Sequence, residues 1–249
     1  MDEEMRPYNP LDRVELGKSV ERALLARPLV SLDGFLARNP KHQPELRYPK
    51  FPGAGLYALY YRGTLACYAK IALPVPPDRQ IPIYVGRARP KGARQGALGL
   101  SSTSDGPVLF QRLREHARSI LAAHEPNVSG DTRSLSILDF TCRYLVADEI
   151  WVPLGEALLI GRYRPVWNVV VDGFGNHHQG SGRDKQAQSL WDTLHPGRSF
   201  AKRLPPSAST AREIEARVVR HLAETESPDL DRTPSIDDEV MRALNQERD

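Results

Sequence analysis

Two short apolar stretches decide the fold of this chain: Gly55-Leu56-Tyr57-Ala58-Leu59-Tyr60-Tyr61 and Ile81-Pro82-Ile83-Tyr84-Val85-Gly86. Both are rich in aromatic and aliphatic residues and lie next to glycine, which is typical of β-strands. The proline inside the second stretch favours an edge position or the start of a strand. Each stretch contains a tyrosine, Tyr57 or Tyr84, for which burial in a sheet is the ordinary role.

The rest of the chain predicts further strands and helices around this pair. Apolar stripes at helical spacing predict helices over residues 14–25, 107–123, 151–163 and 209–224. Asp105 is the expected N-cap of the second helix, and Thr210 with Glu213 forms a capping box at the last. Apolar runs predict more strands over residues 65–71, 135–146 (a central strand) and 166–171. We therefore expect an α+β fold, with a small mixed sheet flanked by helices.

The composition is that of an ordinary globular protein, with 40% hydrophobic and 26% charged residues among 249. No apolar stretch approaches the roughly 18 residues that span a bilayer, and no secretory signal opens the chain. The two cysteines, Cys67 and Cys142, cannot form a disulfide framework or a structural zinc site, and Cys142 is expected in the core. These features predict a cytoplasmic protein without membrane association.

Charge is unevenly distributed along the chain. Residues 204–249 contain 6 basic and 11 acidic side chains, whereas residues 55–203 contain 19 basic and 12 acidic ones. A basic middle with an acidic tail indicates a polyanionic partner such as nucleic acid. The alternative is a solvated surface without a partner.

Three side chains on predicted helices have unusual surroundings. Glu156 lies in a helix that is apolar almost all round, where a glutamate is paired or bound to a metal. Arg112 and His116 are four residues apart and project side by side, which supplies a phosphate clamp and a titratable imidazole. A structural salt bridge for Glu156 and a solvent-facing Arg112–His116 pair are the alternatives.

Histidines near the end of the basic region suggest a zinc or HNH-type site, but the spacing does not support it. Asn176-His177-His178 and His195 have no cysteine partner and no helical HxxxH spacing. We therefore favour a loop or DNA-contact role for them.

Taken in order, these residues resemble the GIY-YIG nuclease superfamily. Gly55-Leu56-Tyr57 and Tyr84-Val85-Gly86 match its two name-giving tripeptides, with Leu and Val in place of two isoleucines. Arg112 takes the place of the arginine on the first helix, Glu156 that of the metal-binding glutamate, and Asn168 that of the asparagine after the second helix. The resemblance implies a three-stranded sheet for the predicted α+β fold.

Within this superfamily the chain resembles most closely the type II restriction endonucleases that cut CCGCGG. The resemblance runs from about residue 8 to 203 and leaves the acidic tail outside. Its matching stretches are Asn9-Pro10-Leu11-Asp12, Gly55 to Tyr61, Pro82 to Ala88, His116-Ala117-Arg118-Ser119-Ile120, Asp139 to Val146, Pro165-Val166-Trp167-Asn168, Gly173-Phe174-Gly175-Asn176-His177, and Trp191 to Arg198. It divides the chain into an N-terminal helical extension (1–50), an endonuclease domain (51–203) and a partly helical acidic tail (204–249).

The resemblance implies a role for each site residue in phosphodiester hydrolysis. Glu156 binds one Mg²⁺ per active site, with Mn²⁺ as a substitute, and Asn168 orients Glu156 or the water shell of the metal. Arg112 holds the scissile phosphate and Tyr84 positions water or phosphate. Either Tyr57 or His116 is the general base, because a free phenol has a pKa of about 10 and needs a neighbour to take its proton.

The resemblance also implies double-stranded DNA as the partner. Guanine is read best by arginine, so the candidate DNA contacts are basic residues of the loops 87–107 and 172–203: Arg87, Arg89, Lys91, Arg94, Arg183, Lys185 and Arg198. A palindromic site implies a homodimer or an assembly of dimers, and a restriction role implies pairing with a cytosine DNA methyltransferase. The alternatives are a homing, transposon-linked or repair nuclease, and a non-catalytic DNA-binding module of the same fold.

Overall fold

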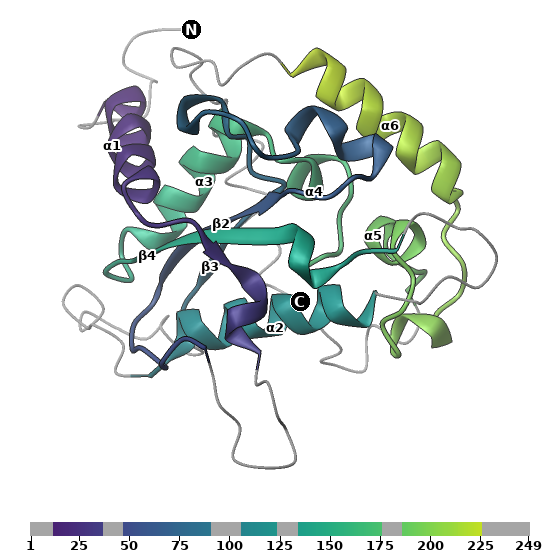
Figure 1. The fold of residues 1–249 in the computed structure, drawn as a ribbon, viewed down its shortest axis with the longest axis horizontal. Helices are drawn as coiled ribbons and strands as arrows, with labels where there is room; N and C mark the ends of the chain where they lie inside the picture. The colour runs from purple at the N-terminus through teal and green to yellow at the C-terminus, as the bar shows by residue number, and fades with distance from the viewer. Residues whose placement is uncertain (1–11, 37–46, 91–105, 124–133, 176–185, 226–249) are drawn as a thin grey trace, which may run out of the picture.

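The structure, a computed structural model, describes residues 12–36, 47–90, 106–123, 134–175 and 186–225 (Figure 1). They form an α+β fold in which helices flank one antiparallel sheet, which confirms the predicted class. The strands are β1 (Val30–Ser31), β2 (Gly55–Tyr61), β3 (Tyr84–Ala88) and β4 (Phe140–Val146). The α-helices are α1 (Arg13–Leu25), α2 (Val108–Ala122), α3 (Val152–Tyr163), α4 (Val166–Val169), α5 (Leu190–Leu194) and α6 (Ala211–Glu224). Short 3₁₀ helices are η2 (Leu32–Phe35), η3 (Ala66–Ile71), η4 (Pro77–Arg79), η6 (Ile137–Asp139) and η8 (Ala201–Arg203).

The sheet has the strand order β1-β4-β2-β3, and every neighbouring pair is antiparallel. Three strands make up most of it, and the two-residue β1 adds a fourth that the sequence did not predict. The strand that follows Pro82 lies at the edge, as the proline predicted. β4 lies inside the sheet, also as predicted, but begins at Phe140 because residues 137–139 form η6.

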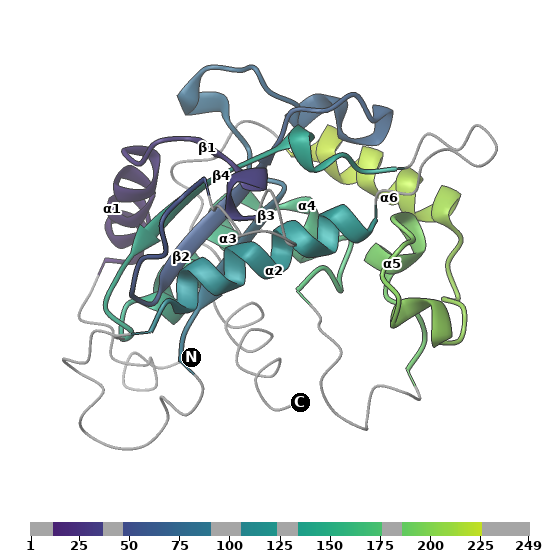
Figure 2. The same ribbon diagram turned by 60° about the horizontal axis from the view of Figure 1, so that its bottom comes forward.

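Alternation along β2 gives the sheet two apolar faces. Tyr57, Leu59 and Tyr61 belong to the larger hydrophobic cluster, together with the buried side of α2. Leu56, Ala58 and Tyr60 belong to a second cluster, which includes residues of α1 and α3. Figure 2 shows α2 running along one face of the sheet, and Figure 1 shows α1 beside α3. β2 therefore packs against α2 with one face and against α3 with the other.

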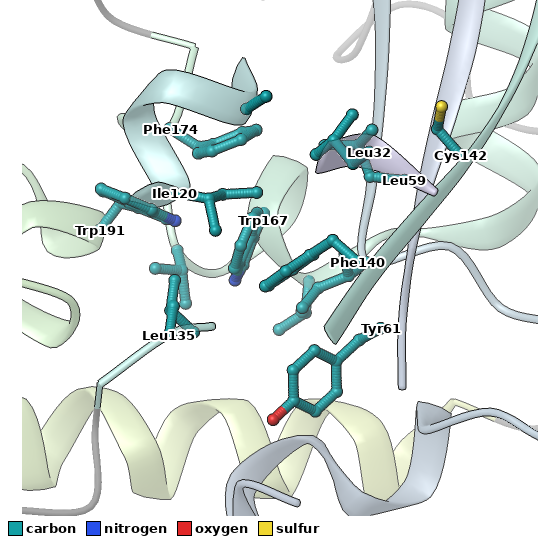
Figure 3. Packing of buried hydrophobic residues seen from close by; sticks show 14 of the residues in the cluster. Leu32, Leu59, Tyr61, Ile120, Leu135, Phe140, Cys142, Trp167, Phe174 and Trp191 are labelled. Atoms are coloured by element: carbon teal, nitrogen blue, oxygen red, sulfur yellow. The ribbon is translucent and has the colours of Figure 1, made fainter. Parts of the chain in front are cut away.

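The larger cluster is centred on aromatic rings. Trp167 packs against Phe140 with ring centroids 5.6 Å apart and against Phe174 at 4.6 Å. Trp191 meets the Trp167 ring edge-on at 5.7 Å. Figure 3 shows Trp167 with Phe174 and Trp191 on one side and Phe140 on the other. This core therefore joins the sheet to the segments that follow α4. Cys142 is also fully buried there, as expected.

Two predicted strands are helical instead. The strand predicted over residues 65–71 is the 3₁₀ helix η3. Its buried residues Tyr68 and Ile71 are three positions apart, which is the period of a 3₁₀ helix and not of a strand.

The strand predicted over residues 166–171 is also wrong, because the segment begins with the short helix α4. The Val169 amide bonds to the Pro165 carbonyl at 3.0 Å, and the Val170 amide bonds to the Val166 carbonyl at 3.0 Å. Burial of Trp167 outweighs the β-propensity of the valines.

The longer helices agree with the prediction, apart from one cap. α1 and α3 lie over the expected residues, and α3 ends at Arg164 in the left-handed conformation before Pro165. The N-cap of α2 is Pro107, which supplies no side-chain cap, and not Asp105, which lies outside the described residues. Within the described residues, no helix is both long and apolar enough to span a membrane.

Helix α6 packs onto the larger core through one apolar stripe. The capping box is formed by Thr210 and Glu213 as predicted, and Ile214, Val218 and Leu222 are buried in the cluster. His221 Nε2 lies 2.8 Å from the Arg164 carbonyl oxygen at the end of α3. The helix that opens the acidic C-terminal region is thus joined to the rest of the fold.

Two adjacent valines of α6 test this packing. We expect Val218→Ala, a fully buried position, to lower the free energy of unfolding by roughly 2 kcal/mol, because it leaves a cavity. Val219→Ala is the matched control, since that side chain is 53% exposed and alanine favours a helix. Urea denaturation measures both, and equal stability of the two variants would contradict a docked α6.

Candidate active site

The site is built around a hydrogen bond between β2 and α2. Tyr57 Oη lies 2.5 Å from His116 Nε2, and both residues are completely buried. Their ring centroids are 5.3 Å apart. In the tautomer whose Nε2 carries no proton, the Tyr57 hydroxyl donates to the imidazole, so the phenol has a partner able to take its proton.

The second tyrosine lies beside the first because of the strand register. Tyr57 stands opposite Gly86 in the β2–β3 pairing, and the Tyr57 and Tyr84 rings are 6.2 Å apart. A Cβ atom at Gly86 would overlap the Tyr57 hydroxyl and stand 2.8 Å from the Tyr84 ring. Glycine is therefore required at this position to leave room for both tyrosines. In the other tripeptide, a Cβ at Gly55 would overlap the Leu145 carbonyl of β4.

Arg112 lies on the same side of α2 and faces these tyrosines. Its Nη2 donates to the Gly175 carbonyl at 3.1 Å, and its Nη1 pairs with Glu115 at 3.2 Å. Burial alone would lower the pKa of Arg112, but the hydroxyls of Tyr57 and Tyr84 raise it above its usual value. Arg112 is therefore a permanent cation next to two phenols, a good position for binding an anion.

The tyrosines are electrostatically coupled to charged groups on three elements. Burial raises the pKa of Tyr57 well above 10, Tyr84 and Glu156 raise it further, and Arg112 lowers it. Burial likewise raises the pKa of Tyr84, and Arg112 lowers it. At neutral pH both hydroxyls are thus protonated, and Tyr57 can accept a proton only by passing its own to His116.

Glu156 lies on α3, across the edge strand from the tyrosines. It forms an ion pair with Arg87 of β3 (Nη1 to Oε2, 2.9 Å), and the two side chains are only 12% and 13% exposed, respectively. Arg87 follows the alternation of Val85, which faces the α1 and α3 side of the sheet. The candidate site therefore surrounds β3, with phenols, imidazole and Arg112 on one face and the carboxylate on the other.

Asn168 binds the outer edge of β3, the strand that separates the two faces of the candidate site. Its Oδ1 accepts from the Val85 amide and its Nδ2 donates to the Val85 carbonyl, both at 2.8 Å. The side-chain amide thus replaces the neighbouring strand that an edge residue lacks. The sequence predicted that Asn168 orients Glu156 or a metal's water shell. In the structure it holds the strand that carries Tyr84 and Arg87.

A family comparison agrees with this constellation. Residues 49–222 match the model of the Eco29kI GIY-YIG domain. The chain belongs to this family. It is thus a GIY-YIG nuclease of the restriction-endonuclease type, for which DNA is the partner and a divalent metal is the general cofactor. The match ends inside α6, beyond the range of about 8 to 203 that the resemblance suggested. Among curated proteins, no match was found.

One part of the GIY-YIG site was missed by the sequence analysis. Phe174 stacks on His116, with centroids 4.5 Å apart and an angle of 19° between the rings. It lies in the turn Gly173–Phe174–Gly175, whose last carbonyl binds Arg112. Gly173-Phe174-Gly175 belongs to one of the stretches that carry the resemblance, but the sequence alone assigned Phe174 no role in the site.

The predicted DNA contacts fall into three groups. Arg87 pairs with Glu156, and Arg89 lies partly exposed just after β3. Arg198 is only 3% exposed and forms an ion pair with Asp192, so the structure places it inside the protein and contradicts its predicted contact with DNA. Four of the predicted contacts lie outside the described residues: Lys91, Arg94, Arg183 and Lys185.

His195 likewise lies in the interior, not on a loop surface. It is completely buried, and its Nε2 lies 2.7 Å from the Tyr68 hydroxyl, which also accepts from Trp167 Nε1 at 2.9 Å. The burial of His195 contradicts the DNA-contact alternative, although the residue does lie outside a helix, directly after α5. His177 and His178 lie outside the described residues.

The hydrogen bonds of Asn168 to the edge strand give a testable consequence. We expect Asn168→Ala to speed hydrogen exchange at the Val85 amide and to cost about 1–3 kcal/mol of stability, because two edge groups lose a partner. The Ile83 amide, which bonds to the Leu59 carbonyl at 2.8 Å, is the internal control and should keep its relative protection. Unchanged exchange at Val85 would show that Asn168 does not hold β3.

Proposed function

We propose that this GIY-YIG protein is a type II restriction endonuclease that hydrolyses phosphodiester bonds of double-stranded DNA in a Mg²⁺-dependent reaction. Its proposed site is a short GC-rich palindrome, with CCGCGG as the sequence to test first. The observation that carries the proposal is the Tyr57–His116 hydrogen bond beside Arg112, at the strand edge that also carries the Glu156 pair. A homodimer and a partner cytosine methyltransferase complete the proposal, because a palindrome calls for two-fold symmetry.

The residues around Glu156 fit a divalent metal of the Mg²⁺ type. Among the described residues, no group of three or more His, Cys, Asp or Glu side chains gathers to hold a metal. Mg²⁺ needs no such group, since it takes one or two carboxylates and keeps several waters. Glu156 is a largely buried carboxylate, and it lies near enough to both site tyrosines for its charge to raise their pKa. When bound there, the metal would stabilise the charge that develops on the phosphate.

The side chains divide the work of hydrolysis. Tyr57 passes its proton to His116 Nε2 as it takes a proton from the attacking water. The oxygen of that water forms a bond to phosphorus, the bond from phosphorus to the leaving sugar oxygen breaks, and the leaving oxygen takes a proton from solvent water. Arg112 holds the phosphate oxygens as negative charge builds on them, and Tyr84 orients the water or the phosphate. Asn168 keeps the strand of Tyr84 in place.

We propose DNA contacts for two basic residues at this edge and for four more that lie outside the described residues. Arg87 and Arg89 flank the site at the end of β3, and Lys91, Arg94, Arg183 and Lys185 belong to the segments outside the described residues. Arg87 already neutralises Glu156, so a cation that binds this carboxylate competes with the guanidinium. We propose that Arg87 contacts the DNA backbone when this competition releases it.

The carboxylate provides the direct test of the proposal. With unmethylated plasmid and Mg²⁺, the protein should give discrete fragments whose ends map to one palindrome. Glu156→Ala should abolish cutting and keep DNA binding, since it removes the metal ligand. The matched control is Glu15→Ala, which removes an exposed glutamate that pairs with Lys18 on α1. Random degradation, or no cleavage with any divalent metal, would overturn the restriction role.

A second pair of variants tests the proton path. Tyr57→Phe should slow single-turnover cleavage by about 100-fold or more, because the hydroxyl is part of the base. Tyr68→Phe removes an equally buried hydroxyl that also lies next to a histidine nitrogen, and should leave the rate unchanged.

The pH dependence follows from the same pair. Because burial raises the pKa of Tyr57 well above 10, the hydroxyl stays protonated in neutral solution and the wild-type rate should rise with pH through the alkaline range. This rise should be missing in Tyr57→Phe and preserved in Tyr68→Phe. The same pH profile for both variants would exclude Tyr57 from the base.

A further inference from the structure

We infer that Arg198 is a positioning residue of the cleavage site: from inside the protein it holds the Gly173–Gly175 turn, and that turn orients His116 and Arg112. The inference rests on the proposed function for its effect on cleavage, whereas the geometry of the turn can be tested without it. It also gives Arg198 a role other than the DNA contact expected from the sequence.

Arg198 is anchored by a buried two-point ion pair. Its Nε lies 2.6 Å from Asp192 Oδ1, and its Nη2 lies 2.7 Å from Oδ2. The guanidinium also lies over the Trp191 ring at 4.5 Å and over the Phe200 ring at 4.9 Å. A planar guanidinium fixed along one edge by a carboxylate has its remaining donors pointing in set directions.

Those donors bind two successive carbonyls of the turn. Nη2 donates to the Gly173 carbonyl at 2.9 Å, and Nη1 donates to the Phe174 carbonyl at 3.2 Å. Gly173 has φ of 97°, which favours glycine, so the backbone can turn there and present both carbonyls. A single buried arginine thereby fixes the path of the turn.

The turn acts on His116 through the Phe174 ring. Phe174 is held on its other sides by Trp167 and Trp191, at 4.6 and 5.2 Å between centroids (Figure 3). Its face stacks on the His116 imidazole at 4.5 Å. A ring stacked in a packed core cannot rotate freely, so His116 keeps its Nε2 toward the Tyr57 hydroxyl.

The turn acts on Arg112 through the Gly175 carbonyl. That carbonyl accepts from Arg112 Nη2 at 3.1 Å. A Cβ at Gly175 would stand 3.0 Å from Tyr84 Oη and 3.4 Å from Arg112 Nη2, so the backbone passes directly against the site. Arg198 thus sets two catalytic side chains at once, through an aromatic stack and through a carbonyl.

Arg198→Lys provides the test. Lysine keeps a cation opposite Asp192, but one ammonium group does not span a carboxylate and two carbonyls. We expect single-turnover cleavage at saturating protein to fall by about 10- to 100-fold, with DNA affinity unchanged, because the catalytic groups move by a fraction of an ångström to an ångström. The ring-current shift that Phe174 imposes on the His116 proton signals should change in the same variant, whether or not the protein cleaves DNA.

Two further variants keep this test decisive. Arg143→Lys is the matched control: Arg143 is also buried, donates to the Arg27 carbonyl at 3.0 Å and lies over the Tyr60 ring, which belongs to the other apolar face. It should lose stability and keep the cleavage rate and the His116 signals. Asp192→Asn weakens the ion pair that anchors Arg198 without changing any residue of the turn or of the proposed catalytic set, and decides the question if Arg198→Lys does not fold.

Several outcomes would overturn the inference. They are a wild-type cleavage rate in folded Arg198→Lys, a loss of DNA affinity with an unchanged rate at saturation, and unchanged His116 signals. A wild-type protein that cleaves no DNA would defeat the proposed function instead. In that case the His116 signals alone decide whether Arg198 positions this histidine.

Discussion

The pairing of β2 with the edge strand β3 is the constraint on which the site depends. Tyr57 stands opposite Gly86 in this register, and the glycine leaves the space that the two phenols share. A slip by one residue would turn Tyr57 or Tyr84 to the other face of the sheet, away from α2. An edge strand has a neighbour on one side only, so the hydrogen bonds of Asn168 to Val85 supply the second. The name-giving tripeptides are thus a packing requirement as much as a catalytic one.

A buried tyrosine–histidine hydrogen bond does not by itself make a reactive site. The fold contains two such pairs among the described residues, Tyr57 with His116 and Tyr68 with His195, at 2.5 and 2.7 Å. Burial raises the pKa of both tyrosines well above 10. The difference lies in the surroundings: Arg112 lowers the pKa of Tyr57, whereas Tyr68 is surrounded by Trp167 and other neutral groups, with Glu215 acting to raise its pKa. The neighbouring cation, more than the hydrogen bond, separates the candidate catalytic pair from the structural one.

Most of the fold and the main site residues could be predicted from local patterns. The strands around Tyr57 and Tyr84, the helices α1, α3 and α6, and the edge position of β3 follow from periodicity, proline and capping residues. The strands predicted over residues 65–71 and 166–171 were wrong, because the burial of Tyr68 and Trp167 in the core outweighs local β-propensity. Spacing along a chain also carries no information on pairing between distant segments. For that reason the bonds of Asn168 to β3 and the stacking of Phe174 on His116 became visible only in the structure.

The arginines show that an excess of positive charge in the sequence need not lie on the surface of the protein. The excess of basic residues in the range 55–203 suggested a surface that binds a polyanion. Several of these arginines, however, are buried inside the protein. Arg198 binds Asp192 and two carbonyls, Arg143 binds a carbonyl of the N-terminal segment, and Arg162 pairs with Glu21 of α1 at 2.6 Å. Arg198 and Arg143 bind backbone carbonyls that lie outside the helices and strands, whereas Arg162 joins two helices. The Gly173–Gly175 turn is such backbone, and it lies against Tyr84 and Arg112. In the mechanism that we propose, positive charge serves catalysis in two ways: directly, through Arg112 beside the phenols, and indirectly, through Arg198, which fixes the turn against which Arg112 and His116 are aligned.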